Sequence, residues 1–119
     1  MISVTKIFTF DSAHNLRDYE GACKNLHGHT YKLEVTVTGE INKIGMICDF
    51  NKLSSLVKSG IISRLDHKYL NEVFEFNPTC EMMVKWMWDE CEKMFCNEEC
   101  KLEKIVLWET PTSFATITR

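Results

Sequence analysis

The chain has 119 residues, a hydrophobic content of 45% and a formal net charge of −3. This length is typical of one folded domain, which we assign to residues 1–119. The weakly acidic charge, without a basic stripe, argues against a nucleic-acid partner. No apolar run approaches the roughly 18 residues of a membrane span, and the start lacks a signal-peptide pattern, so we expect a cytoplasmic protein.

Two alternating segments open the chain. Residues 4–16 (VTKIFTFDSAHNL) and residues 30–41 (TYKLEVTVTGEI) alternate in polarity and predict two strands, with a turn over residues 39–45. The spacing of apolar residues changes over residues 46–65, which predicts a helix that begins near Asp49 or Phe50. Gly60 would be a weak point of that helix or its end.

The second half of the chain predicts one irregular connection, one helix and two strands. The connection covers residues 66–76, and Asn77 is the expected cap of a helix with the body CEMMVKWMWDECEKMF. The segments LEKIVLWET and FATITR predict two further strands joined around Pro111. Strands and helices that occur in blocks indicate an α+β fold with an antiparallel sheet.

Three of the four histidines are candidates for a metal site. His27 and His29 flank Gly28, so on a strand both imidazoles would project from the same face. His14 lies at the end of the first predicted strand and would join them if the two strands pair. Three neutral histidines leave a fourth position open, as in catalytic zinc sites. The spacing alone leaves open a chance pair of histidines without metal.

Other residues are candidates for acid–base chemistry or ligand binding, each with a plain alternative. Cys23 is a loop thiol that would serve as a base or nucleophile beside a cation, or is an ordinary free thiol. Asp66 and His67 would form an acid–base pair, or else be a helix cap and a surface residue. Glu109 closes an apolar strand, where its carboxylate would accept two parallel N–H bonds or reach solvent.

The chain has six cysteines but no sign of secretion. In a reducing compartment we expect free thiols for Cys48, Cys80 and Cys91. Cys96 and Cys100 would be a candidate pair for a structural zinc, although no matching His or Cys pair follows them in the sequence.

Six motifs taken together resemble the 6-pyruvoyl-tetrahydropterin synthase family. They are FTFDSAHNL, CKNLHGHTY, GMICDFNKL, LDHKYLN, NPTCE and WET, which occur in the family's order from Phe8 to about Thr110. Within that family, the three residues between Cys23 and His27 and the segment NPTCEMMVKWMWDE resemble the bacterial 6-carboxy-5,6,7,8-tetrahydropterin synthase branch.

The resemblance implies the tunnelling fold, a four-stranded antiparallel sheet with two helices on one face. It also implies that subunits join edge to edge into a β-barrel, as a hexamer or similar homo-oligomer, with active sites at subunit contacts. The implied site has three zinc ligands, a proton-transfer group and two substrate contacts. These are His14, His27 and His29 for Zn²⁺; Cys23, Asp66 and His67 for proton transfer; and Glu109 with Thr79 for the pterin.

The activity implied by the resemblance is a lyase reaction on 7,8-dihydroneopterin triphosphate. It would yield 6-carboxy-5,6,7,8-tetrahydropterin, acetaldehyde and triphosphate, on the way to 7-deazaguanine nucleosides such as queuosine. Two alternatives stay open: a pyruvoyl-forming synthase with the same site, and a pterin- or zinc-binding module without catalysis. Lys24, Lys32 and Lys68 are candidates for the triphosphate on charge alone.

Overall fold

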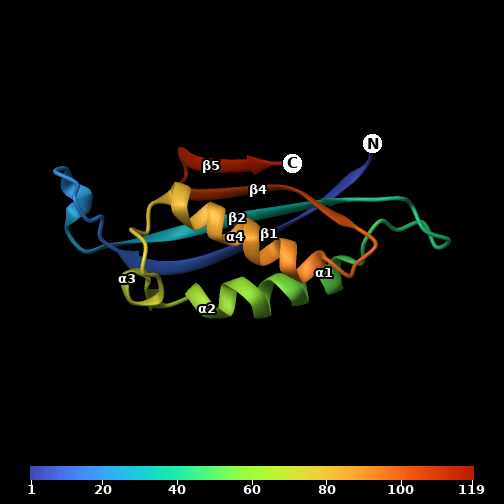
Figure 1. The fold of residues 1–119 in the computed structure, drawn as a ribbon, viewed down its shortest axis with the longest axis horizontal. Helices are drawn as coiled ribbons and strands as arrows, with labels where there is room; N and C mark the ends of the chain where they lie inside the picture. Colours follow the sequence, from blue (N-terminus) through green and yellow to red (C-terminus); the bar gives the residue numbers. More distant parts are fainter.

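A long sheet forms one layer of the protein and helices cover one of its faces, in a computed structural model that describes all 119 residues (Figure 1). The strands are β1 (Ser3–His14), β2 (His27–Thr38), β3 (Lys68–Tyr69), β4 (Lys101–Thr110) and β5 (Ser113–Thr118). Their order across the sheet is β3-β1-β2-β4-β5. The four longer strands pair antiparallel, and the short turn between β4 and β5 makes these two a hairpin.

The prediction of a four-stranded antiparallel sheet is wrong by one short strand. β3 pairs in parallel with β1, where Lys68 lies opposite Ser12 and Tyr69 lies opposite Ala13, so the sheet is five-stranded and mixed. A strand of two residues carries no alternation that a sequence could reveal. The region that we expected to be irregular also holds a short helix, α3 (Leu70–Val73).

The first long helix is continuous but changes its winding. It comprises α1 (Phe50–Val57), a π-helical segment η2 (Lys58–Ile62) and α2 (Ser63–Leu65). The carboxylate of Asp49 caps it by accepting a hydrogen bond from a backbone N–H of the first turn. At Gly60 the helix widens rather than ends. A Cβ there would lie 2.2 Å from Cε of Met94, so any larger residue would require the Met94 side chain to move.

The second long helix is α4 (Cys80–Phe95), and its cap differs from our expectation. The hydroxyl of Thr79, not the side chain of Asn77, accepts the hydrogen bond from Met82 N. Asn77 instead binds the backbone of Arg17, accepting from its N–H at 2.9 Å and donating to its carbonyl at 3.1 Å. Tertiary contacts therefore decide which of two cap-forming residues is used.

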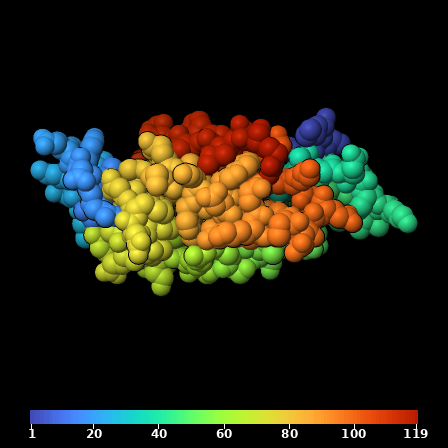
Figure 2. Space-filling model, viewed as in Figure 1, coloured from blue at the N-terminus to red at the C-terminus, as the bar shows by residue number.

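The core lies between the helices and the sheet. On β1 and β2 every second side chain faces the helices, and Tyr31, Leu33 and Val35 are fully buried. Figure 2 shows the helices closed over this face, with the connection between β1 and β2 at one end of the molecule and the connection between β2 and α1 at the other. None of the helices is long and apolar enough to cross a membrane.

Candidate functional site

The pairing of β1 with β2 brings three histidines together. His14 lies opposite His27, and Ser12 lies opposite His29, so all three imidazoles project from the face that the helices cover. His14 is fully buried, and its ring lies 4.6 Å from that of His27 and 5.0 Å from that of His29 between centroids. The predicted convergence of the three rings is present in the structure.

Backbone carbonyls orient two of these rings. His14 donates from Nδ1 to the Pro78 carbonyl at 2.8 Å, and His27 donates from Nδ1 to the Asn25 carbonyl at 2.7 Å. Because a carbonyl can only accept, each Nδ1 carries the proton and each Nε2 of the neutral ring is a lone-pair acceptor. Carbonyl acceptors of this kind commonly orient metal-binding histidines.

The three Nε2 atoms form a set of acceptors that suits a cation. Nε2 of His14 and Nε2 of His27 are 3.0 Å apart, and ligand atoms of all three histidines lie within 4.8 Å of one another. Nε2 of His29 is buried without a hydrogen-bond partner. Acceptors that face one another are repulsive unless a positive charge lies between them. The cluster therefore has the chemistry of a three-histidine metal site.

Burial favours the neutral form that a metal requires. It lowers the pKa of His14 and of His29 below the ordinary value of 6.5, although the carboxylate of Glu109 opposes this effect at both residues. Both rings are thus available as neutral ligands at neutral pH.

Glu109 belongs to this cluster. One carboxylate oxygen lies 3.6 Å from Nε2 of His14 and 3.9 Å from Nε2 of His29. The pairing of β4 with β5 is irregular between Trp108 and Thr110, and such irregularities re-aim side chains near functional sites. These distances place the Glu109 carboxylate on the helix-covered face with the histidines, where Leu107 of the same strand is also buried.

Tyr31 underlies the cluster and was missed by the sequence reasoning. Its hydroxyl lies 3.4 Å from Nδ1 of His14, and its ring lies 5.5 Å from the ring of His29 between centroids. Burial raises the pKa of the Tyr31 hydroxyl, so it stays protonated. Its place two residues after His29 on β2, on the same strand face, is the signal that would have indicated it.

Asp66 and His67 form a second group at the edge of the sheet. Nδ1 of His67 lies 3.0 Å from a carboxylate oxygen of Asp66, a direct contact that adjacent residues seldom make. The His67 backbone has φ of 60°, an uncommon value for a residue other than glycine. The backbone N–H of Asp11 donates to Asp66 at 2.9 Å, and this bond, followed by the contact with His67, lowers the pKa of Asp66.

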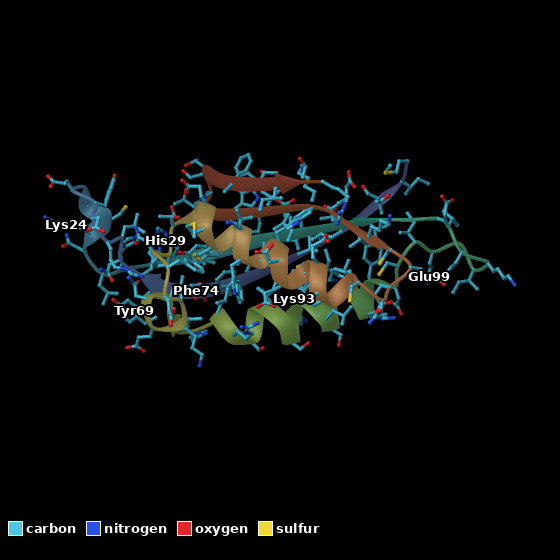
Figure 3. The ribbon with its side chains drawn as sticks, viewed as in Figure 1. Lys24, His29, Tyr69, Phe74, Lys93 and Glu99 are labelled. Carbon is cyan, nitrogen blue, oxygen red and sulfur yellow. The ribbon has the colours of Figure 1, made fainter.

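An open cavity of about 550 Å³ is lined by residues of β1, β2 and β3. They include His29 from the first group, His67 from the second, and Lys68 and Tyr69 from β3. Figure 3 shows His29 and Tyr69 at the same end of the molecule. Of the three lysines named for a triphosphate, Lys68 is the one that lines this cavity. Lys32 instead lies over the ring of Trp108, 4.4 Å from its centroid.

Cys23 does not join Asp66 and His67 within one chain. It lies in the short 3-10 helix η1 (Ala22–Lys24), where its carbonyl accepts a hydrogen bond from Leu16 N, and it is absent from the cavity lining. Figure 3 places the adjacent Lys24 at the tip of the molecule, away from Tyr69. The thiol is partly exposed.

Thr79 directly follows, in the chain, a residue that contacts the histidine cluster. The preceding residue, Pro78, supplies the carbonyl that orients His14, while the Thr79 hydroxyl oxygen caps α4. The hydroxyl of Thr79 is thus already engaged as an acceptor, a role that the sequence reasoning gave to Asn77.

Curated proteins with similar sequences share pterin-related names. The chain is 33% identical, over an alignment 139 positions long, to the 6-carboxy-5,6,7,8-tetrahydropterin synthase of Haemophilus influenzae, covering 96% of each chain. It is 41% identical over 101 residues to the dihydroneopterin monophosphate aldolase of Pyrococcus furiosus, covering 85% of this chain and 83% of that one.

The structural comparison and the family model point to the same family as these sequence comparisons. The 6-pyruvoyl tetrahydropterin synthase of Caenorhabditis elegans superposes with a TM-score of 0.86 and 26% identity, covering 99% of this chain and 95% of that one. The family model described as 6-pyruvoyl tetrahydropterin synthase matches residues 3–119. The chain therefore belongs to the 6-pyruvoyl tetrahydropterin synthase family.

Proposed function

We propose that the protein is a zinc-dependent lyase of pterin metabolism. It would convert 7,8-dihydroneopterin triphosphate and water into 6-carboxy-5,6,7,8-tetrahydropterin, acetaldehyde and triphosphate. The carboxypterin would be a precursor of 7-deazaguanine nucleosides such as queuosine. The observation that carries the proposal is the set of three convergent Nε2 atoms beside the Glu109 carboxylate. The similarity to the Haemophilus influenzae synthase supports this choice of reaction. Such a reaction on a phosphorylated metabolite suits the cytoplasm.

His14, His27 and His29 would hold the zinc ion, with a fourth position left for substrate. Bound there, zinc would act as a Lewis acid that makes protons next to the side-chain hydroxyls of the pterin easier to remove. The carbonyls of Pro78 and Asn25 keep two of the rings in the tautomer that this role requires.

Glu109 would anchor the pterin ring beside the histidines. Its carboxylate can accept two parallel N–H bonds from the 2-amino-pyrimidinone edge, a charge-assisted and geometrically specific contact. Thr79 would donate its hydroxyl hydrogen to the substrate while its oxygen continues to cap α4. Lys68, at the cavity rim, is the favoured contact for the phosphates.

Cys23, Asp66 and His67 would move protons between the ring and the side chain. Asp66 holds His67 through their 3.0 Å contact, an arrangement that orients an imidazole for acid–base work. Because Cys23 is absent from the cavity that His67 lines, we propose that a neighbouring subunit completes the group.

Edge-to-edge assembly into a barrel is part of this proposal. β3 pairs only with Ser12 and Ala13, so most of the outer edge of β1 can pair with another chain, and β5 offers the opposite edge. The helix-free face exposes Ile7 and Phe114, which such closure of the sheet into a hexamer or similar oligomer would cover.

A second candidate is aldolase cleavage of dihydroneopterin monophosphate. It is favoured by the 41% identity to the Pyrococcus furiosus protein of that name. The same acid–base group could break a side-chain carbon–carbon bond of either substrate. Cleavage of the monophosphate would leave its phosphate on the aldehyde fragment, whereas the synthase reaction releases triphosphate and free acetaldehyde.

Product analysis tests the proposal. Zinc-loaded protein is incubated separately with the triphosphate and the monophosphate of 7,8-dihydroneopterin, and pterins and aldehydes are identified by mass spectrometry. Carboxypterin and acetaldehyde from the triphosphate alone would support the proposed reaction. A phosphorylated aldehyde from the monophosphate would support the aldolase, and a pyruvoyl product without acetaldehyde would indicate the sister synthase. Pterin binding without turnover would support the alternative of a non-catalytic pterin-binding module.

A further inference from the structure

Two cysteines meet at the end of the molecule opposite to the histidines. Cys48 and Cys100 both line a cavity of about 320 Å³, together with Lys52 and Glu98. Figure 3 labels Glu99, the neighbour of Cys100 in the chain, at the far end from His29. This pair takes no part in the proposed reaction, and no sequence motif indicated it.

The backbone holds the two cysteines in one packed region. Cys100 is 4% exposed and directly precedes β4, while Cys48 is partly buried and lies just before the cap of α1. A Cβ on Gly39 would lie 3.4 Å from the Cα of Cys100 and 3.4 Å from Cγ2 of Ile47. The connection that carries Cys48 is therefore pressed against the start of β4.

The pairing differs from the one that sequence proximity indicated. Cys96 is exposed and lines a different cavity, with Glu92 and Arg119, so it does not share a site with Cys100. The groups of His, Cys, Asp and Glu with metal-binding spacing do not include Cys48, Cys96 or Cys100. Two thiolates alone fall short of the four ligands of a structural zinc, so the expected second zinc pair has no support.

The Cys48 thiol is protonated at neutral pH and lies beside the Cys100 side chain. Burial, followed by the contact with the Cys100 thiol, raises the pKa of Cys48 to about 12. Lys52 opposes this shift, but its ammonium group is paired with Glu98 at 2.6 Å. Asp49 and Glu99 also line the cavity and add negative charge. Cys48 therefore reacts as a thiolate only when the pH is raised.

We propose that Cys48 and Cys100 are a disulfide-forming pair, and that their reversible cross-link ties the connection between β2 and α1 to the start of β4. The oxidant is a small-molecule disulfide such as oxidised glutathione. The more accessible Cys48 thiolate attacks one glutathione sulfur and releases the first glutathione thiolate. Cys100 then attacks Cys48 in the mixed disulfide and releases the second. Two electrons pass from the protein thiols to the oxidant, and their two protons go to the released thiolates.

The cross-link is expected to stabilise the fold without changing the active site. It closes a loop of about half the chain, which restricts the unfolded state and raises Tm by about 10 °C. The histidine cluster and the Asp66–His67 group lie at the other end of the sheet, so turnover measured below Tm should be unchanged.

Peptide mapping of the zinc-loaded protein tests the proposal. The protein is equilibrated with mixtures of oxidised and reduced glutathione at alkaline pH, digested without reduction, and analysed by mass spectrometry. A linked Cys48–Cys100 peptide, with a Tm increase that reduction reverses, is the expected result. Cys96→Ala is the matched control and should keep both effects, whereas Cys48→Ala should lose both. Free Cys48 and Cys100 at every glutathione ratio, or a cross-link through Cys96, would overturn the proposal.

Discussion

His14 and His27 face one another through their Nε2 atoms, 3.0 Å apart, while each gives its Nδ1 proton to a backbone carbonyl. Two acceptors held this close need a positive charge between them. Nε2 of His29 is a third buried ring nitrogen at the same place, and it has no hydrogen-bond partner. Three convergent imidazoles of this kind are the donor set of a metal site.

Removal of one of these rings should abolish tight zinc binding. We expect His29→Ala to lower zinc affinity by more than about 100-fold, because even the loss of an outer-shell partner costs a metal site 10–100-fold. Competition with a chromophoric chelator measures the affinity. Cys96→Ala is the control, since Cys96 belongs to none of the groups with metal-binding spacing and should leave zinc affinity unchanged. Equal affinities for the two variants would contradict the assignment.

Replacement of the Cys23 thiol should separate catalysis from metal binding. We expect Cys23→Ala to keep zinc and the fold but to lower kcat by about 10²–10⁴-fold, the usual contribution of a positioned proton donor or acceptor. Cys96→Ala, at an exposed cysteine outside the proposed site, should turn over normally. Full activity of Cys23→Ala would rule out the proposed role of the thiol.

Asp66→Asn should impair turnover while it preserves the local backbone. Asparagine can still accept the hydrogen bond from Asp11 N, which joins the group to β1. It cannot supply the negative charge beside His67, so we expect kcat to fall by about 10²-fold. Zinc content and Tm, measured in parallel, should stay near those of the original protein. A normal kcat would show that Asp66 is only structural.

Glu109→Gln should weaken pterin binding. The amide offers one acceptor and no charge, so affinity for a substrate analogue should fall by about 10–100-fold, in line with the loss of a charged hydrogen bond. Fluorescence titration with a pterin measures this affinity, and zinc content serves as the control. Unchanged affinity would mean that the pterin edge is bound elsewhere.

Metal-free protein should lose stability in mild acid. The pKa values of His14 and His29 are lowered by burial, so below the ordinary value of 6.5 the unfolded chain binds more protons than the folded one. Their contribution to the free energy of unfolding is complete above pH 6.5 and decreases as the pH falls through the lowered values. Urea unfolding in the presence of a chelator, repeated across this range, measures the trend. Constant or rising stability towards acid would contradict the burial of neutral rings.

The sequence predicted the histidine cluster because strand geometry is regular. Side chains alternate along a strand, so the spacing of His27 and His29 and the position of His14 at the end of β1 were enough to place three rings on one face. The direct contact between Asp66 and His67 was not predictable, because it depends on the positive φ of His67.

Long-range contacts account for the remaining differences. Asn77 and Thr79 are both good helix caps, and only the use of Asn77 by the Arg17 backbone leaves the cap to Thr79. The strand β3 is too short to show a pattern. Cys100 lies beside Cys48 rather than near Cys96, a pairing created by the packing of two connections.

X-ray absorption at the zinc edge would identify the ligands of the metal. On protein loaded with one zinc ion per chain, we expect three imidazole nitrogens at about 2.0–2.1 Å, a further light-atom ligand and no sulfur. His29→Ala should lose this signal, and Cys23→Ala should keep it. A zinc–sulfur distance of about 2.3 Å would contradict the three-histidine site and move the metal to a cysteine.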